Sequence, residues 1–251
     1  MIIYIACAKI MTGGFPVGIS LTTAPHFQDE ANRIALLMAG CDVVELKNRL
    51  HVNTAIAREN WDRFQSFFDE TKKAIPAAFA YDGMVFKKLA PETFSADELP
   101  YLNEHLLIAS FLYGLLRPLD LVKPYRLEGN VMFPELGGLN LFEHWKPLLT
   151  DYFIERIKAD DGILVNLASE EMKSLLDWNR VKKEVEIITP DFHVMKDGKL
   201  KTIVIYTKMC RGAMTRFILK NRITSPEELK LFEYEGFALD ESKEEFQFVL
   251  K

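Results

Sequence analysis

The chain opens with Met1-Ile2-Ile3-Tyr4-Ile5-Ala6-Cys7-Ala8-Lys9. Residues Ile2–Ala6 are apolar, short in extent and rich in β-formers, which predicts a buried strand. The start carries no basic cluster, and the apolar stretch is of strand length, so it does not resemble a secretory signal. Thr12-Gly13-Gly14-Phe15-Pro16 then predicts a loop. We therefore expect the fold to be built around an N-terminal strand whose end presents Lys9.

Helical and strand-like segments follow in no regular order. Helical periodicity or capping signals mark Gln28–Met38, Asp42–Leu50 (capped by Asp42), Thr54–Phe68 (capped by Asn53), Ala96–Glu104 (capped by Ser95), Leu141–Ile157, a helix that begins after Ser169, and Lys208–Asn221. Strand patterns mark Gly162–Ala168, Val185–Thr189, Leu200–Thr207 and Phe246–Leu250, with a hairpin turn at Asp197-Gly198. Leu106–Leu116 is apolar throughout and fits either a strand or a helix. This mixture, without repeats or a linker, predicts one α+β domain over residues 1–251, with a mixed sheet surrounded by helices.

Composition excludes several classes of protein. Of the 251 residues, 49% are apolar and 27% are charged, which is typical of a globular chain. No apolar run approaches the ~20 residues that a membrane helix needs. Three cysteines and five histidines are dispersed, without the spacing of a disulfide framework or a zinc site. HExxH and GxSxG do not occur. We therefore expect a cytoplasmic protein with no membrane association, no metal and no cofactor.

The charge is unevenly distributed. The formal net charge is −5, and residues 225–251 alone, with eight acids and three bases, carry all of it. Residues 208–222 hold five bases, Lys208, Arg211, Arg216, Lys220 and Arg222, and no acid. A phosphate backbone senses this local field rather than the average charge. The alternative is a solvated helix face whose cations pair with acids elsewhere.

Leu112-Tyr113-Gly114-Leu115-Leu116-Arg117-Pro118-Leu119-Asp120-Leu121-Val122-Lys123-Pro124-Tyr125-Arg126-Leu127-Glu128 is the most distinctive stretch. Each proline disfavours helix in the residue before it, so Arg117 and Lys123 are expected in extended segments, with Arg126 close behind. Guanidinium forks held in this way suit bidentate phosphate binding. Alternatively, Asp120 and Glu128 consume these cations in structural ion pairs, and the spacing does not decide.

Asn166-Leu167-Ala168-Ser169-Glu170-Glu171 places a strand end before a capped helix. Backbone N–H groups at such a junction often face a ligand, although capping alone accounts for Ser169. Glu170 is a candidate acid or base. Asn166, Ser169, Glu170 and Asp120 are therefore candidate polar residues of a cleft. The phosphate-loop pattern GxxxxGK[ST] and the GxGxxG pattern are both absent.

In combination these segments resemble the YaaA family, bacterial peroxide stress resistance proteins. The resemblance rests on five stretches in the family's order: Ala8-Lys9, Tyr81-Asp82-Gly83-Met84-Val85-Phe86, Leu112 through Glu128, Asn166 through Glu170, and Arg211-Gly212 with Met214, Arg216 and Phe217. Ala6-Cys7 stands where the family has Ser-Pro. The long block is highly specific, and the match spans nearly the whole chain.

The resemblance implies an unusual α+β fold with a positively charged cleft and a helix-hairpin-helix element that binds DNA. It also implies a role under peroxide stress, in which lower free iron limits oxidative damage to DNA. The hairpin would fall on Leu46–Phe64. Its turn reads His51-Val52-Asn53, without the glycine usual in such hairpins, which leaves DNA binding through this element open.

Two hypotheses follow. In the first, a cleft binds DNA by its shape rather than its sequence, through Lys9, Arg117, Lys123, Arg126, Lys208, Arg211 and Arg216. In the second, the same cations bind a nucleotide or another phosphorylated small molecule, and Glu170 or Asp120 acts in catalysis. A cleft wide enough for a duplex would favour the first hypothesis. A narrow pocket would favour the second.

Overall fold

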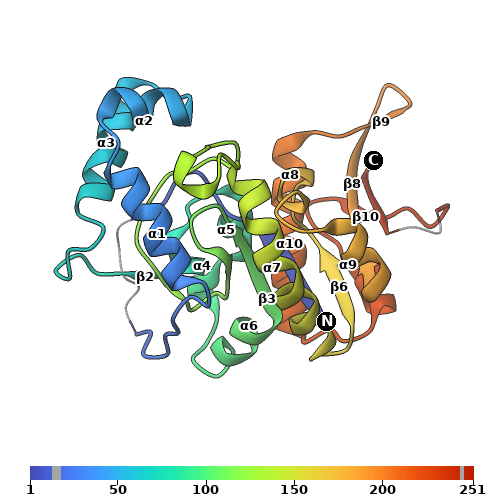
Figure 1. Ribbon diagram of the computed structural model, residues 1–251. Helices are drawn as coiled ribbons and strands as arrows, with labels where there is room; N and C mark the ends of the chain where they lie inside the picture. The colour runs from blue at the N-terminus through green and yellow to red at the C-terminus, as the bar shows by residue number, and fades with distance from the viewer. Residues whose placement is uncertain (13–17, 244–245) are drawn as a thin grey trace.

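The computed structural model describes residues 1–12, 18–243 and 246–251 (Figure 1). Its helices are α1 Gln28–Ala39, α2 Val43–Leu50, α3 Thr54–Gln65, α4 Ala77–Ala80, α5 Met84–Leu89, α6 Leu99–His105, α7 Leu141–Lys158, α8 Glu170–Lys173, α9 Trp178–Glu184 and α10 Val204–Asn221. Its strands are β1 Ile2–Ala6, β2 Ile75–Pro76, β3 Leu106–Ser110, β4 Gly114–Leu116, β5 Leu121–Val122, β6 Ile163–Asn166, β7 Glu186–Ile188, β8 Asp191–Lys196, β9 Lys199–Lys201, β10 Phe237–Leu239 and β11 Gln247–Leu250. Single 3₁₀ turns lie at Pro91–Thr93 and Pro134–Leu136, and a longer 3₁₀ segment lies at Pro226–Leu231.

The N-terminal strand is the centre of the main sheet. In the described residues this sheet has the order β4-β3-β1-β6-β7, and β1 pairs in parallel with both β3 and β6. Ile2 through Ile5 are all buried, as expected for a parallel strand with both of its faces covered. Only β4 runs antiparallel, beside β3. The predicted α+β fold, with a mixed sheet among helices, is confirmed.

A second sheet lies at the C-terminal end of the chain. Its order in the described residues is β10-β11-β8-β9, with β8 and β11 parallel. The predicted hairpin joins β8 to β9, and both Asp197 (φ 54°) and Gly198 (φ 70°) have the left-handed conformation that a type I′ turn requires. Figure 1 shows this hairpin projecting at the upper right, and α2 and α3 projecting at the upper left.

The hairpin of α2 and α3 forms without a glycine in its turn. Asp42 and Glu45 make a reciprocal capping box at the start of α2, and the Asn53 side chain accepts a hydrogen bond from Ile56 N at the start of α3. His51 ends α2 in the left-handed conformation, at φ 50°. Both predicted caps are therefore confirmed, while α3 ends at Gln65, before the predicted Phe68.

Two predicted elements differ from the structure, one in where it begins and one over most of its length. The helix expected over Ala96–Glu104 begins only at Leu99, because Pro100 is tolerated in the first turn of a helix but not in its interior. The strand expected over Leu200–Thr207 ends at Lys201, and α10 begins at Val204. β-Branched residues at 203–205 suggested a strand, but packing of α10 on α5 overrides that local preference.

Two further sequence predictions concern an apolar stretch of undecided secondary structure and a loop near the N-terminus. Leu106–Leu116 is neither one strand nor one helix but the antiparallel pair β3 and β4, joined by a turn that ends at Gly114 (φ 70°). The loop predicted at Thr12–Pro16 falls mostly on residues 13–17, which lie outside the described residues.

Candidate functional site

A pocket of about 340 Å³ opens at the carboxyl edge of the main sheet. Its walls include Cys7 after β1, Phe111 after β3 and Leu167 after β6. From β1 the sheet extends to β3 and β4 on one side, and from β6 it extends to β7 on the other. The chain therefore leaves β1 toward one side of the sheet and leaves β6 toward the other side. Open parallel sheets commonly bind ligands at such a point, next to the carboxyl ends of the two strands.

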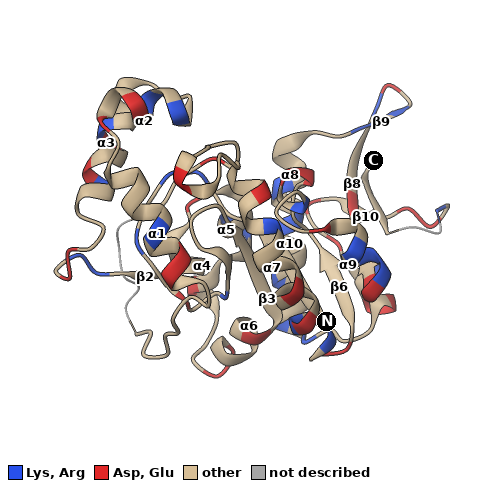
Figure 2. Cartoon of the chain, in the orientation of Figure 1, with Lys and Arg blue, Asp and Glu red and all other residues tan. Residues whose placement is uncertain are grey.

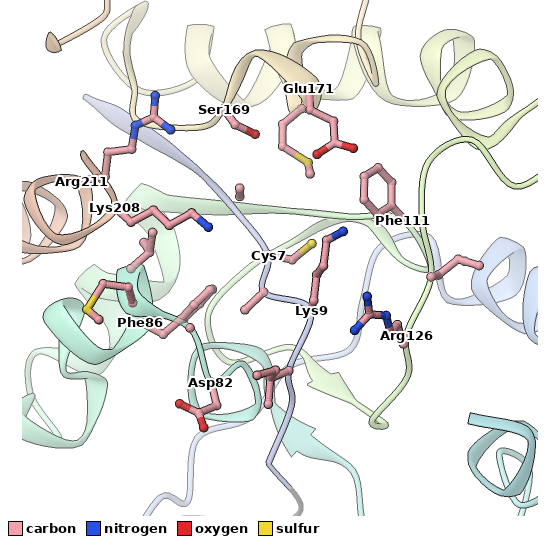
Figure 3. Close-up of a pocket in the computed structure, with 18 of the residues that line it drawn as sticks. Cys7, Lys9, Asp82, Phe86, Phe111, Arg126, Ser169, Glu171, Lys208 and Arg211 are labelled. Atoms are coloured by element: carbon pink, nitrogen blue, oxygen red, sulfur yellow. The ribbon is translucent and has the colours of Figure 1, made fainter. Parts of the chain in front are cut away.

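Four of the seven predicted cations line this pocket: Lys9, Arg126, Lys208 and Arg211. Lys9 follows β1, Arg126 follows β5, and the other two lie on α10. Figure 3 shows Arg211 and Lys208 on one side of the pocket, and Lys9 and Arg126 on the other. Cations from three separate segments thus converge on one cavity. Figure 2 shows blue Lys and Arg positions near the labels of α8 and α10.

Two of the guanidinium groups are incompletely paired. The Nε atoms of Arg211 and Arg126 are buried and have no hydrogen-bond partner among the described residues. Burial lowers the pKa of Arg211, and the nearby charges of Asp191 and Glu170 oppose that shift. A buried donor without an acceptor is costly, so these groups are suited to an anion that supplies the acceptor.

Glu128 holds the other two cations together. Its carboxylate lies 2.8 Å from Lys9 Nζ and 3.2 Å from an Arg126 terminal nitrogen. The pairing that the sequence left open therefore exists, but it joins Arg126 to Glu128 beside the pocket and does not remove Arg126 from its wall. The side chain of Lys9 remains 61% exposed, so its ion pair with Glu128 is weak.

Close backbone packing brings α10 and α5 to the pocket. Gly212 lies against α5, and a Cβ there would stand 2.9 Å from Lys88 Cβ, closer than real side chains approach. Gly83, just before α5, is packed against Ala8 in the same way, because a Cβ at position 83 would stand 2.7 Å from the Cβ of Ala8. Glycines at these two contacts let the cations of α10 and the segment after β1 share one cavity.

The pocket also contains two carboxylates and a thiol that were not predicted as site residues. These are Asp82, Glu171 and Cys7. Asp82 lies 3.0 Å from Lys87, on the helix that it precedes. Burial, reinforced by the charge of Glu171, raises the pKa of Cys7 to about 12. Cys7 is therefore a protonated thiol at neutral pH, and the thiolate is the form that reacts.

A buried hydroxyl network supports the segment that carries Arg126. The Tyr125 hydroxyl lies 2.9 Å from that of Tyr81 and 2.7 Å from that of Ser110. The backbone N–H of Tyr113 donates to Ser110 Oγ. Burial raises the pKa of both Tyr81 and Tyr125 far above the usual range, so both stay neutral. The network fixes Tyr125 and, through the backbone, the position of Arg126.

The other three predicted cations lie outside this pocket and have structural partners. Arg117 forms a 3.0 Å ion pair with Asp120 and donates to the carbonyl of Ala24. Lys123 donates to the carbonyls of Phe67 and Asp69. Arg216 donates to the carbonyls of Leu89 and Ala90 and to the Thr93 hydroxyl. The structure therefore separates these three cations from the four that line the pocket.

The predicted polar residues divide in the same way. Ser169 lines the pocket, and its side chain makes no capping bond to α8. Glu170 points outward, with its side chain 85% exposed and paired with Lys173. Asp120 is 1% exposed and held by Arg117 and Thr23. Asn166 is buried and accepts from Ala168 N, which shapes the loop after β6.

A signal for the missed residues was present in the sequence. Cys7 precedes Ala8-Lys9, Asp82 lies in the Tyr81–Phe86 stretch, and Glu171 follows Glu170. Each belongs to a stretch that was singled out, and the parallel pairing of β1, β3 and β6 is what brings the stretches together.

Among the described residues, no group of three or more His, Cys, Asp or Glu side chains is placed to hold a metal ion. No helix of that part of the chain is long and apolar enough to cross a membrane.

Comparison with known proteins agrees with the resemblance. The model of the family described as peroxide stress protein YaaA matches residues 1–243. The chain belongs to this family. It is 57% identical to a UPF0246 protein of Bacteroides thetaiotaomicron over 242 residues, 96% of this chain and 94% of the relative. It is 49% identical to one of Porphyromonas gingivalis, over 94% and 93% of the two chains, and 44% identical to one of Parabacteroides distasonis, over 98% and 96%.

Proposed function

We propose that this member of the peroxide stress protein YaaA family binds DNA by its phosphate backbone at the basic pocket, and thereby helps to limit iron-driven damage to DNA. The observation that carries the proposal is the convergence of Lys9, Arg126, Lys208 and Arg211 on one cavity. The unpaired Nε atoms of Arg126 and Arg211 add to it. Membership of a peroxide stress family supplies the cellular setting.

Phosphate oxygens would satisfy these guanidinium groups and release condensed counterions from the DNA. Contacts of this kind position a protein without reading base sequence. We therefore expect binding that follows the shape of the DNA rather than its sequence. The charge of Glu128 offsets one of these four cations, so if the remaining three positive charges neutralise phosphates, the logarithm of the affinity falls with the logarithm of salt concentration with a slope of about −2.7 on a duplex.

The hairpin of α2 and α3 is the second surface proposed to contact the backbone. The left-handed turn at His51 supplies the geometry that a glycine usually provides, and the N-terminus of α3 follows it directly. Lys47 and Arg49 lie in the last turn of α2. Helix N-termini favour phosphate, and neighbouring cations strengthen that preference. Lys47→Ala, in the last turn of α2, should weaken binding if the hairpin contributes to affinity.

The experiment is fluorescence-anisotropy binding of duplex, single-stranded and branched DNA over a salt series. Arg211→Ala and Arg126→Ala should each weaken binding about tenfold and make the salt slope less steep by about 0.9. Arg180→Ala is the matched control, because Arg180 is a surface arginine on α9 that pairs with Asp151 and Glu184 away from the pocket. Wild-type affinity and slope in folded Arg211→Ala and Arg126→Ala proteins would refute the assignment of the pocket.

The size of the pocket favours a second candidate function. A cavity of about 340 Å³ with a largely apolar wall is typical of a small-molecule site, so a nucleotide or another phosphorylated small molecule fits it. For an enzyme of this kind the carboxylates in place are Glu171 and Asp82, rather than Glu170 or Asp120. A thermal-shift screen of nucleotides and sugar phosphates tests this function. Stabilisation by one such compound, without any DNA binding, would replace the first proposal by the second.

A further inference from the structure

The pocket is too small for a duplex but large enough for part of one. A cube of about 340 Å³ has an edge of about 7 Å, whereas the major groove of B-DNA alone is about 12 Å wide. A duplex bound at this site therefore stays at the mouth. The volume of the pocket lies near the lower end of the range for ligand pockets, and it suits a unit of the size of a single nucleotide.

The apolar part of the pocket suits a flat aromatic group. Phe86 and Phe111 both contribute to the wall and are held firmly, since each is less than 5% exposed. Figure 3 shows the two rings on different sides of the pocket, with Cys7 between them. Met84 and Met172 also belong to this apolar lining. Because little of either ring is exposed, a base in this part of the pocket gains mainly from burial of apolar surface.

The polar part of the pocket suits a phosphate and a set of hydrogen-bond donors. Arg211 and Lys208 stand together at one side, and the Ser169 hydroxyl lies near them (Figure 3). Glu171 and Asp82 face the same cavity. Carboxylates accept hydrogen bonds from the exocyclic amino groups of bases, so they provide partners for a base edge.

We infer that the pocket holds one nucleotide unit, with its phosphate against Arg211 and Lys208 and its base in the apolar part lined by Phe86 and Phe111. The unit is either a free nucleoside monophosphate or a nucleotide turned out of a DNA strand. The second source rests on the proposed function. Turning a nucleotide out of a duplex costs a few kcal/mol, and least where it is already unpaired, so DNA with an unpaired nucleotide should bind most tightly.

The test compares two DNA duplexes that differ by one bulged 2-aminopurine nucleotide, together with free deoxyadenosine monophosphate. Affinity is measured by anisotropy and calorimetry, and shielding of the 2-aminopurine base by acrylamide quenching. We expect the bulged duplex to bind about tenfold more tightly than the paired one, and the quenching constant of its 2-aminopurine to fall several-fold on binding. Phe111→Leu should remove both effects. Phe68→Leu, at an exposed phenylalanine that does not line this pocket, should change neither.

The outcomes separate this inference from the proposed function. Equal affinity for both duplexes, with the base fully open to acrylamide and no binding of the monophosphate, overturns the inference and leaves DNA binding standing. Binding of the monophosphate without binding of either duplex supports the nucleotide pocket and overturns the DNA proposal. Binding of none of the three ligands overturns both. Because base shielding is measured on the wild-type protein, the test does not depend on the folding of a variant.

Discussion

Gly212 of α10 lies directly against the backbone carbonyl of Val85 in α5, so that position 212 has no room for a methyl group. Arg211 is the preceding residue, and Lys208 lies one turn earlier on the same helix. The approach of these two helices therefore sets where the two cations stand in the pocket. A glycine inside a helix lowers the stability of the helix by about 1 kcal/mol relative to alanine. Close packing against α5 explains why a glycine stands at position 212.

Gly212→Ala should lower both stability and anion binding. The new methyl group forces α10 away from α5, and overpacking of this kind costs about 1–3 kcal/mol, more than the gain in helix propensity. The displaced Arg211 and Lys208 then bind DNA less tightly. Urea unfolding and anisotropy measure the two effects. Gly40→Ala is the control, because a Cβ at Gly40 meets only ordinary contacts and its φ is −73°. A Gly212→Ala protein as stable as wild type would contradict the packing argument.

Arg117→Ala should destabilise the protein without altering the pocket. Asp120 is almost fully buried, and Arg117 is its charged partner at 3.0 Å. Removing one member of a buried pair costs about 3 kcal/mol, because the other charge stays buried without its counterpart. Bonds to Asp120 from Thr23 and from the Arg117 backbone remain. The free energy of unfolding should fall while DNA affinity of the folded protein is retained. Lost affinity with unchanged stability would place Arg117 in the binding surface instead.

The contrast between Arg117 and Arg211 shows how far the sequence determines the site. Strands, caps and hairpin turns follow local rules, so β1, the Asp42 cap and the Asp197-Gly198 turn could be predicted. Local rules do not say which cations converge on one cavity. The ion pair of Arg117 with Asp120 joins residues only three positions apart and was one of the two alternatives that the sequence left open, whereas Arg211 faces a cavity that forms only when β1, β3 and β6 pair and α10 packs on α5.

The pH dependence of stability should reveal the raised pKa of the half-buried Cys7 thiol. Its pKa rises from an ordinary value of 9.0 to about 12, chiefly through burial. Above pH 9 the unfolded chain releases this proton while the folded protein keeps it, so the free energy of unfolding falls as pH rises. The contribution of Cys7 is complete below pH 9 and is lost at about 1.4 kcal/mol per pH unit as pH rises toward 12.

Comparison with Cys7→Ala isolates this group from the buried tyrosines, which titrate at higher pH. Guanidinium unfolding of both proteins at pH 7, 9 and 10 gives the difference in stability. That difference should shrink by about 1 kcal/mol between pH 9 and pH 10. A difference that stays constant across this range would mean that Cys7 has an ordinary pKa and is open to solvent in the pocket.

Glu128→Gln should strengthen the binding of polyanions. The carboxylate of Glu128 neutralises Lys9 and Arg126, 2.8 and 3.2 Å away, and the amide keeps its shape without its charge. Because one negative charge is removed, one more positive charge meets phosphate, so affinity at low salt should rise several-fold and the salt slope should steepen by about 0.9. The exposed pair with Lys9 contributes little to stability, whereas loss of the charge beside the mostly buried Arg126 should lower the free energy of unfolding modestly. Glu227→Gln, which removes an exposed carboxylate paired with Lys230, is the control and should leave the slope unchanged. Weaker DNA binding by Glu128→Gln would show instead that this carboxylate is needed to aim Lys9 and Arg126.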